Sequence, residues 1–403
     1  MNIALFTDSY YPQINGVATS VHMLKQELEG LGHTVYVFTT TDPLSDRRSE
    51  LKKGVFRLRS IKVMSERRLG LFPSPRLIRF VTRLKIDVIH THTEFSLGIL
   101  GRSVAWYFNI PVIHTYHTIY EFYTHFFVKA GFLDSYAKRA VRNASASVCN
   151  QAKMVIVPTR KVQHLLRTYG VYRPISVIPT GISIDRFLRD ESTLRRRQAL
   201  RAEMGYQVTD RILLYLGRVS EEKDIHVLID TLAPVLKRDT RTKLLLVGDG
   251  SARLGLEQQV FELGLTDKVH FAGQKPWDDI ASYYHMSDLF VTASQSETQG
   301  LTYIEALASG LPVIAKDDLC LEGVVEDGVN GQTWTDETSL SKALEGLWPG
   351  STSLDEMSKA ATVSAEQFTA KRFAKRVESV YKQVIKDYHA GDFTAMSLGK
   401  RKA

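Results

Sequence analysis

The stretch Ser294–Gly310 reads SQSETQGLTYIEALASG and decides the interpretation of the fold. It follows a short apolar run at 289–291, which is typical of a buried strand. The stretch itself predicts a loop followed by a helix that ends at Gly310, a residue suited to a left-handed C-cap. A second apolar run, at 312–314, predicts the next buried strand. Strand, loop, helix and strand in this order indicate an open α/β sheet, whose ligands bind outside the carboxyl ends of the strands.

Two acids and a glycine in this stretch suggest a site for a sugar joined to a diphosphate. Glu297 is predicted to lie in the loop and Glu305 about two turns into the helix, where each carboxylate could accept hydrogen bonds from a pair of hydroxyls. Gly300 allows a phosphate to approach the backbone closely, and the N–H groups of Gly300 and Leu301 would face an anion at the helix start. The alternative is a solvated loop glutamate and a glutamate on the helix surface.

Length and composition indicate a two-domain protein of ordinary globular character. A chain of 403 residues is too long for one core and suggests two domains of about 150–200 residues each. Cys149 and Cys320 form no C-x-x-C pair, which fits a reducing compartment. No basic leader segment precedes Asp8, and no apolar run reaches the roughly 18–20 residues of a membrane span. We therefore expect a cytoplasmic protein with access to the inner membrane face.

The positive charge is concentrated in one region. The formal net charge is +8, yet residues 47–85 alone carry 13 lysines and arginines against two glutamates. Large apolar residues are interleaved with these cations and again with those of 125–142, a mixture that favours contact with anionic lipid. The alternative is a solvated charged face over core residues, and no motif supports nucleic-acid binding. The candidate membrane or acceptor residues are Arg67, Arg68, Leu71, Phe72 and Lys129.

The N-terminal residues predict a strand, a helix and a second parallel strand. An apolar strand at 3–6 leads into a loop that ends near Gly16, and a helix over 17–29 precedes the strand at 35–38. The segment lacks G-x-G-x-x-G, so the fingerprint of a dinucleotide-dependent dehydrogenase is absent. Gly16 offers either a close backbone approach to a ligand or a simple turn.

Four histidines follow two later strands of the first half. His90 and His92 end one strand, and His114 and His117 end the next, so all four fall at the ligand edge of the sheet. Zinc is disfavoured because no cysteine is near and no third ligand has a convincing spacing. We interpret His117 as a neutral donor to a sugar hydroxyl, with a structural histidine as the alternative.

The second half restarts the alternation of strands and helices after a hinge predicted at 180–181. A strand at 212–216 leads into a turn flanked by Arg218 and Lys223. Arginine can clamp a phosphate through two parallel hydrogen bonds, and lysine supplies a point charge. The alternative is an ordinary solvated turn. The strand ending in the tight loop 247–250, VGDG, comes next.

These motifs, taken together, resemble a known family. Gly217-Arg218 with Lys223, the VGDG loop, and Glu297 with Glu305 are similar to the retaining glycosyltransferases of GT-B fold in the glycogen-synthase-like group, family four. The N-terminal segment FTD followed by NGVATS, with HTEFS at 92–96 and HTYHT at 114–118, resembles the bacterial 1,2-diacylglycerol 3-alpha-glucosyltransferases. The resemblance spans about residues 1–386.

The resemblance implies a fold and a division of the chain. It implies an α/β protein with two Rossmann-like doubly wound domains that face each other across a cleft. The N-terminal acceptor and membrane-binding domain would comprise residues 1–181, and the nucleotide-sugar domain residues 182–370. A C-terminal helix at 371–388 would cross back to the first domain, and 389–403 would form a disordered tail.

The resemblance also implies roles for individual residues. Arg218 and Lys223 would bind the diphosphate of UDP-glucose, and Glu305 the ribose hydroxyls. Glu297 would act at the donor sugar near its anomeric carbon. The remaining assignments are His117 in contact with the donor sugar, Gly16 leaving room for it, and Gly300 and Leu301 donating to the phosphates.

The implied activity is transfer of glucose from UDP-glucose to diacylglycerol at the inner membrane face, with retention of configuration. No cofactor would be required by the protein; Mg²⁺ remains open, without a protein ligand set. The alternatives are another lipid, polyprenol-linked or soluble acceptor, a UDP-sugar epimerase on a similar scaffold, or a non-catalytic membrane-binding protein.

Overall fold

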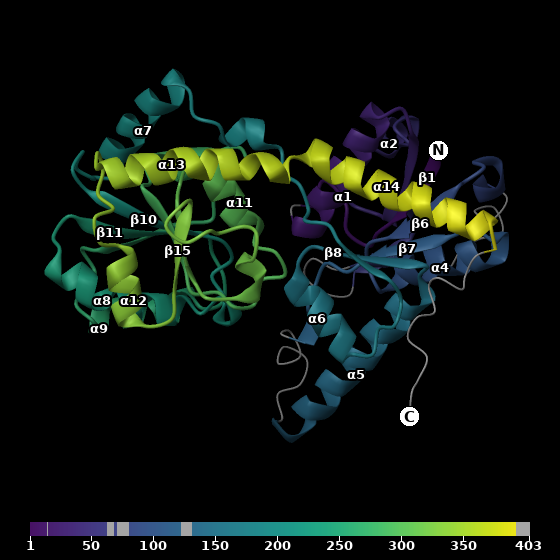
Figure 1. Ribbon diagram of the computed structural model, residues 1–403, viewed down its shortest axis with the longest axis horizontal. Coiled ribbons are helices and arrows are strands. Elements are labelled where there is room, and N and C mark those ends of the chain that lie inside the picture. The colour runs from purple at the N-terminus through teal and green to yellow at the C-terminus, as the bar shows by residue number, and fades with distance from the viewer. Residues whose placement is uncertain (14, 63–67, 71–79, 122–130, 392–403) are drawn as a thin grey trace. The chain divides into compact units, whose positions relative to one another are not determined.

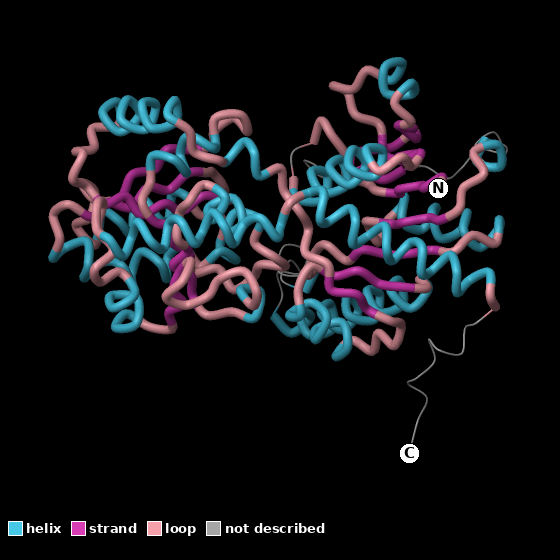
Figure 2. Tube along the Cα trace, turned by 45° about the horizontal axis from the view of Figure 1, so that its top comes forward, coloured by secondary structure: helices cyan, strands magenta, loops and turns pink. Residues whose placement is uncertain are grey.

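The computed structural model describes residues 1–13, 15–62, 68–70, 80–121 and 131–391. The chain divides into two compact units. Unit 1 contains residues Met1–Gly181 together with the C-terminal residues from Ala370, and unit 2 contains Ile182–Thr369. Each unit is a parallel sheet with helices on both faces, as Figures 1 and 2 show for each separately.

Unit 1 is built from alternating strands and helices, with a helix from the end of the chain added. In the described residues its elements are β1 (Asn2–Phe6), α1 (Gly16–Gly30), β2 (Thr34–Thr40), α2 (Arg47–Lys52), β3 (Val55–Leu58), β4 (Ser60–Lys62), β5 (Arg68–Gly70), β6 (Val88–Thr91), α4 (Ser96–Phe108), β7 (Val112–Thr115), α5 (Gly131–Gln151), β8 (Met154–Val157), α6 (Arg160–Thr168), β9 (Ile175–Val177) and α14 (Ala370–His389).

Within the described residues, the main sheet of unit 1 has seven strands in the order β3-β2-β1-β6-β7-β8-β9, all parallel. Ile3 and Leu5 pack on α1 and α14, whereas Ala4 and Phe6 pack with α4, α5 and α6. This alternation is the period-two pattern of a strand buried on both faces.

The helix α14 returns to unit 1 because its apolar stripe fits α1. Phe373, Val377 and Tyr381 are buried in the cluster that contains Val21 and Leu24 of α1. Their spacing of three to four residues places them on one helix face. The prediction of a C-terminal helix that crosses back to the first domain is therefore confirmed.

Unit 2 repeats the architecture. Its elements are η2 (Ile184–Phe187), α7 (Glu191–Glu203), β10 (Arg211–Leu216), η3 (Glu221–Lys223), α8 (Ile225–Arg238), β11 (Thr242–Val247), α9 (Arg253–Glu262), β12 (Val269–Gly273), α10 (Ile280–Met286), β13 (Leu289–Thr292), α11 (Leu301–Ala308), β14 (Val313–Lys316), η4 (Leu319–Leu321), β15 (Gly331–Trp334), α12 (Glu337–Ala343), α13 (Thr352–Ala365) and η5 (Glu366–Phe368).

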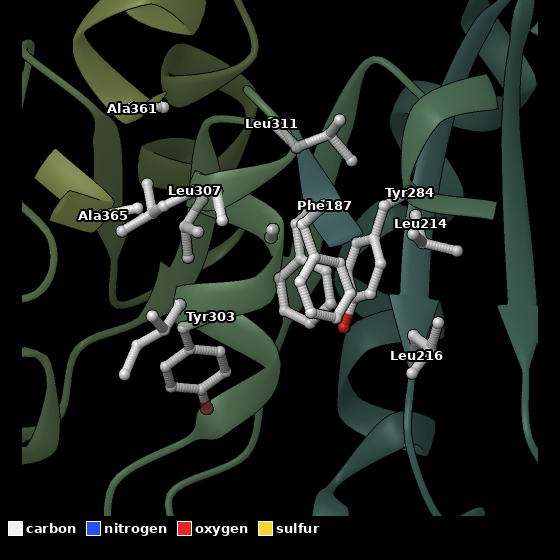
Figure 3. Packing of buried hydrophobic residues seen from close by; sticks show 14 of the residues in the cluster. Phe187, Leu214, Leu216, Tyr284, Tyr303, Leu307, Leu311, Ala361 and Ala365 are labelled. Carbon is white, nitrogen blue, oxygen red and sulfur yellow. The ribbon is translucent and has the colours of Figure 1, made fainter. Parts of the chain in front are cut away.

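The sheet of unit 2, all of whose residues are described, has six parallel strands in the order β12-β11-β10-β13-β14-β15. On one face it packs a cluster that includes Phe187, Tyr284 and Tyr303, which Figure 3 shows beside Leu214 and Leu307. On the other face α8, α9 and α12 cover a second cluster.

Both sheets reverse their strand order at one point. The reversal lies between β1 and β6 in unit 1 and between β10 and β13 in unit 2. Neighbouring loops leave the sheet toward opposite faces at such a point, which opens a crevice for a ligand. The predicted fold class of two Rossmann-like domains is confirmed by this topology.

Candidate functional site

The candidate donor site of unit 2 lies where its strand order reverses. The loop after β10 holds Arg218 and Lys223, and the loop after β13 holds Glu297. Because β10 and β13 are hydrogen-bonded neighbours, these two loops leave adjacent carboxyl ends.

Lys223 and Glu297 form an ion pair across the two loops. Lys223 Nζ lies 2.6 Å from Glu297 Oε1, and both side chains are largely buried. Ser294 Oγ donates to the same carboxylate oxygen at 3.2 Å. A cation and an acid from two neighbouring loops therefore meet at this edge of the sheet.

The first turn of α11, which follows Glu297 in the same loop, offers backbone donors. Gly300 is the N-cap, with φ +73°, and no side chain caps the helix there. A Cβ atom at Gly300 would lie 2.4 Å from the ring of Tyr303, so only glycine fits this backbone conformation without displacement. The early N–H groups of a helix have no intrahelical acceptor and favour an anion. Leu301 is the first residue of α11.

Glu305 lies deeper than Glu297. It is 5% exposed, and Tyr284 Oη donates to its Oε2 at 2.7 Å. Burial raises the pKa of Glu305 to about 7, although the tyrosine bond opposes the shift. The predicted depth of two turns into the helix is wrong. The loop continues through Gly300, whose left-handed conformation precedes the helix, so α11 begins at Leu301 and Glu305 lies just over one turn in.

Arg218 is held by a buried carboxylate. The Arg218 guanidinium lies 3.2 Å from Glu222 Oε1; the arginine side chain is 54% exposed and that of Glu222 only 5%. Neither carboxylate oxygen of Glu222 accepts a hydrogen bond from the described residues, so the guanidinium supplies the nearest compensating charge.

Gly248 and Gly250 let the loop after β11 pack closely against the turn that holds Arg218. A Cβ at Gly248 would lie 1.8 Å from the carbonyl oxygen of Gly217, and one at Gly250 would lie 2.2 Å from that of Val219. The VGDG sequence therefore packs backbone against backbone, and Val219 N donates to Asp249 O at 3.0 Å.

The candidate residues of unit 1 lie at the carboxyl edge of its own sheet. Gly16 is the exposed first residue of α1, whose N-cap Asn15 accepts from Ala18 N at 2.9 Å. His117 follows β7, and its Nε2 lies 3.0 Å from Nδ1 of His92, which follows β6. Burial lowers the pKa of His117 to about 3 and that of His92 well below its usual range, so both rings are neutral at physiological pH.

The second ring nitrogen of His92 favours one direction of the hydrogen bond between His92 and His117. His92 is 1% exposed, and its Nε2 has no hydrogen-bond partner among the described residues. A bare acceptor is tolerated in such a position more readily than an unsatisfied N–H donor. We therefore expect the proton of His92 on Nδ1, donated to His117 Nε2, and the proton of His117 on Nδ1, from which it can be donated to a hydroxyl.

The other two histidines are held by side-chain hydroxyls. His90 bonds Tyr381 Oη at 2.6 Å and Thr115 Oγ1 at 2.7 Å, and its ring lies 3.9 Å from that of His92. His114 Nδ1 lies 2.8 Å from Thr91 Oγ1. Among the described residues, no group of three or more histidines, cysteines or acids has the geometry to hold a metal ion.

Some sequence candidates fall outside what the structure describes. Arg67, Leu71, Phe72 and Lys129 lie outside the described residues, and Arg68 is described only as backbone at the start of β5. Of the helices in the described ranges, none has the length and apolar content to cross a bilayer.

Three contributors to the site were missed in the sequence. The sequence interpretation assigns no role in the site to Glu222, His92 or Tyr284. Burial and orientation give these residues their roles. The one available signal was the position of Glu222 next to Lys223, in the connection that follows β10.

Two family descriptions match the chain. Glycosyltransferase Family 4 matches residues 14–186, and Glycosyl transferases group 1 matches residues 196–363. An alpha-monoglucosyldiacylglycerol synthase of Streptococcus pneumoniae is 38% identical over 388 residues, which cover 96% of this chain and 86% of the relative. A protein of the same description from Acholeplasma laidlawii is 33% identical over 393 residues, covering 96% and 98%.

Solved structures share the fold. The Anabaena Alr3699/HepE protein in complex with UDP superposes with a TM-score of 0.73 at 20% identity, covering 95% of this chain and all of the other. The same protein in complex with UDP-glucose gives a TM-score of 0.71.

Proposed function

The chain belongs to glycosyltransferase family 4, and from that premise we propose that it transfers glucose from UDP-glucose to diacylglycerol with retention of configuration. The product is an alpha-monoglucosyldiacylglycerol, in line with the names of the two relatives. The proposal places the reaction at the inner face of the cell membrane.

One observation carries the donor half of the proposal. Lys223 pairs with Glu297 where the strand order reverses, and the loop of Glu297 leads into α11, whose start no side chain caps. A cation and a set of N–H donors suit a diphosphate, and a carboxylate next to them suits the sugar attached to it.

The chain's own residues supply the electrostatic part of the reaction. Negative charge develops on the departing UDP as the bond to the sugar breaks. Lys223, Arg218 and the N–H groups of Gly300 and Leu301 stabilise that charge, while Glu297 lies near the sugar carbon that becomes electron-deficient. Glu305 accepts hydrogen bonds from the ribose hydroxyls.

The proposal also assigns two residues of unit 1 to the donor sugar. His117, neutral and protonated on Nδ1, donates to a sugar hydroxyl, and the absence of a side chain at Gly16 leaves space for the ring. Peripheral contact with anionic lipid comes from the basic stretches that contain Arg67, Arg68 and Lys129.

The test is a transfer assay with several donors and acceptors. The purified chain is incubated with diacylglycerol vesicles and radiolabelled UDP-glucose, UDP-galactose or GDP-mannose. We expect label in a lipid product, with an alpha linkage by NMR, from UDP-glucose. A soluble acceptor such as inositol phosphate serves as the comparison, since label in the aqueous product alone would contradict a lipid acceptor.

Donor binding is tested separately by UDP titration. Arg218→Ala and Lys223→Ala are each expected to weaken UDP binding about tenfold, because each removes a charge-assisted hydrogen bond. Arg238→Ala, on the far end of α8, is the matched control. Unchanged affinity in both site variants would refute the assignment of the diphosphate contacts.

A further inference from the structure

The face of the unit 1 sheet that packs on α1 and α14 carries polar side chains near its carboxyl edge. Val88, at the start of β6, belongs to the apolar cluster of this face, and the alternation of a strand directs His90 to the same side. In the neighbouring strands His90 is paired with Leu5 and Ile113, which are members of that cluster. His90 is fully buried there, so its ring nitrogens need partners within the protein.

Two hydroxyl groups from other elements hold the ring of His90. Nδ1 lies 2.6 Å from Oη of Tyr381 in α14, and Nε2 lies 2.7 Å from Oγ1 of Thr115 in β7. The Tyr381 ring is itself buried in the cluster and stands nearly perpendicular to the ring of His90, with 5.6 Å between the ring centres. One hydrogen bond at each ring nitrogen fixes both the position and the rotation of the imidazole.

The chemistry of the two hydroxyls favours one tautomer of His90. Burial lowers the pKa of His90 well below its ordinary value, so the ring is neutral and carries a single N–H. A phenol is a stronger hydrogen-bond donor than an aliphatic hydroxyl, whereas the aliphatic hydroxyl is the better acceptor. We therefore expect Tyr381 to donate to Nδ1 of His90, and Nε2 of His90 to donate to Thr115.

The ring of His90 supports that of His92, which in turn contacts His117. The ring centres of His90 and His92 are 3.9 Å apart, and His92 Nδ1 lies 3.0 Å from His117 Nε2. Because Nε2 of His92 has no hydrogen-bond partner among the described residues, the orientation of this ring depends on its packing against His90 and on its bond to His117. Of the three histidines only His117 is partly exposed, so the series begins in the core at Tyr381 and ends where a ligand can be reached.

We infer that Tyr381 is a positioning residue for His117 and that it acts through His90 and His92. The inference rests on the proposed function, because that proposal assigns His117 to the donor sugar. It adds a role for the last helix of the chain, since α14 contributes a hydroxyl that orients the sugar contact as well as the apolar stripe that packs on α1. A closely packed interior transmits a small displacement from one ring to the next.

The expected effect of removing the hydroxyl is confined to the sugar contact. In Tyr381→Phe the ring remains in the cluster, and His90 is held at Nε2 alone. Turnover with UDP-glucose should fall about fivefold, which is the scale of one hydrogen bond. The affinity for UDP should not change, because the proposed contacts to UDP come from unit 2.

The first experiment is independent of activity. Imidazole ¹H–¹⁵N spectra of the ligand-free full chain, labelled at histidine, are compared for the wild type, Tyr381→Phe and Tyr388→Phe. Tyr388→Phe is the matched control, because Tyr388 lies on the same helix and its hydroxyl bonds Asn109 instead of a histidine. We expect the signals of His92 and His117 to shift in Tyr381→Phe and to stay in place in the control.

The second experiment is a double-mutant cycle on turnover. Tyr381→Phe is measured in the wild type and in His117→Ala, with UDP-glucose as donor and diacylglycerol as acceptor. If Tyr381 acts through His117, its substitution lowers turnover in the wild type and has no further effect once the imidazole of His117 is absent. A hydroxyl that only stabilised the fold would instead give independent, multiplicative losses.

Thr115 gives a second approach to the same ring. Thr115→Val removes the other hydrogen bond of His90 at nearly constant volume, and it is expected to shift the same histidine signals and to lower turnover. Thr115→Ser, which keeps the hydroxyl, is expected to recover most of the turnover lost in Thr115→Val. Thermal unfolding checks that each variant is folded.

Each result decides the inference. Unchanged His117 signals in Tyr381→Phe, equal shifts in Tyr388→Phe, or multiplicative losses in the cycle would overturn it. A wild type that transfers sugar from none of the donors would refute the proposed function instead, and the spectra alone would then decide whether Tyr381 orients His117.

Discussion

The buried carboxylate of Glu305 should make both stability and donor binding depend on pH near neutrality. The side chain is 5% exposed and bonded to Tyr284, and its pKa is raised to about 7 by burial. Replacing it in Glu305→Gln keeps the shape and one acceptor oxygen while removing the charge. The ionised form is the one that burial disfavours, so the variant should differ from the wild type only where Glu305 is ionised.

The magnitude follows from the two pKa values. An unfolded glutamate titrates near pH 4.5. Between that pH and about 7, the folded state therefore keeps a proton on Glu305 that the unfolded state has released. The stability contributed by this proton is fully present below the unfolded pKa and is lost as the pH rises through the folded pKa. At about 1.4 kcal/mol for each pH unit, the wild type should lose roughly 2–3 kcal/mol relative to Glu305→Gln between about pH 5 and pH 8.

The assay is denaturant-induced unfolding of both proteins across this pH range. Tyr284→Phe is the control that leaves Glu305 in place. It removes the hydroxyl that stabilises the ionised carboxylate, so the pH at which the stability falls should move upward. In parallel, UDP affinity of the wild type should rise through about pH 7, since the ribose hydroxyls need the ionised acceptor. Identical pH profiles for the wild type and Glu305→Gln would refute the reasoning.

The remaining predictions concern the loop, the helix start and the histidine pair. Glu297→Gln should lower turnover about 100-fold with little change in UDP affinity, because the amide cannot stabilise positive charge on the sugar; turnover equal to the wild type contradicts the assignment. Gly300→Ala should destabilise the fold by about 1–3 kcal/mol and weaken UDP binding, since the left-handed conformation and the contact with a tyrosine ring both oppose a Cβ. Gly323→Ala has a similar φ of +75° but open space around it, so an equal loss there would attribute the effect to φ alone. Imidazole ¹⁵N NMR should find the proton of His117 on Nδ1. In His92→Phe, which lacks the donor to His117 Nε2, the proton should be shared between both ring nitrogens and turnover should fall about tenfold. A proton on Nε2 of His117 in the wild type would rule out donation from His92 to His117.

Local sequence was enough to predict the architecture. Apolar runs such as 289–291 and 312–314, separated by polar loops and amphipathic helices, predict alternating strands and helices because parallel strands are buried on both faces. The loop positions of Arg218, Lys223 and Glu297 follow from the same alternation, since loops after strands gather at one edge of a sheet. The return of the last helix to the first domain was implied by the resemblance, and the spacing of Phe373, Val377 and Tyr381 fits a helix with one apolar face.

Tertiary structure decided which charged groups are buried and what they contact. The sequence placed Glu222 and Lys223 side by side, yet one carboxylate turns inward to Arg218 while the lysine reaches across to Glu297 in another loop. The pKa of Glu305 and the proton position on His117 depend on Tyr284 and His92, which come from other elements. Periodicity encodes which side of an element is apolar, but burial of a single polar group depends on the neighbours that the fold brings to it from distant parts of the chain.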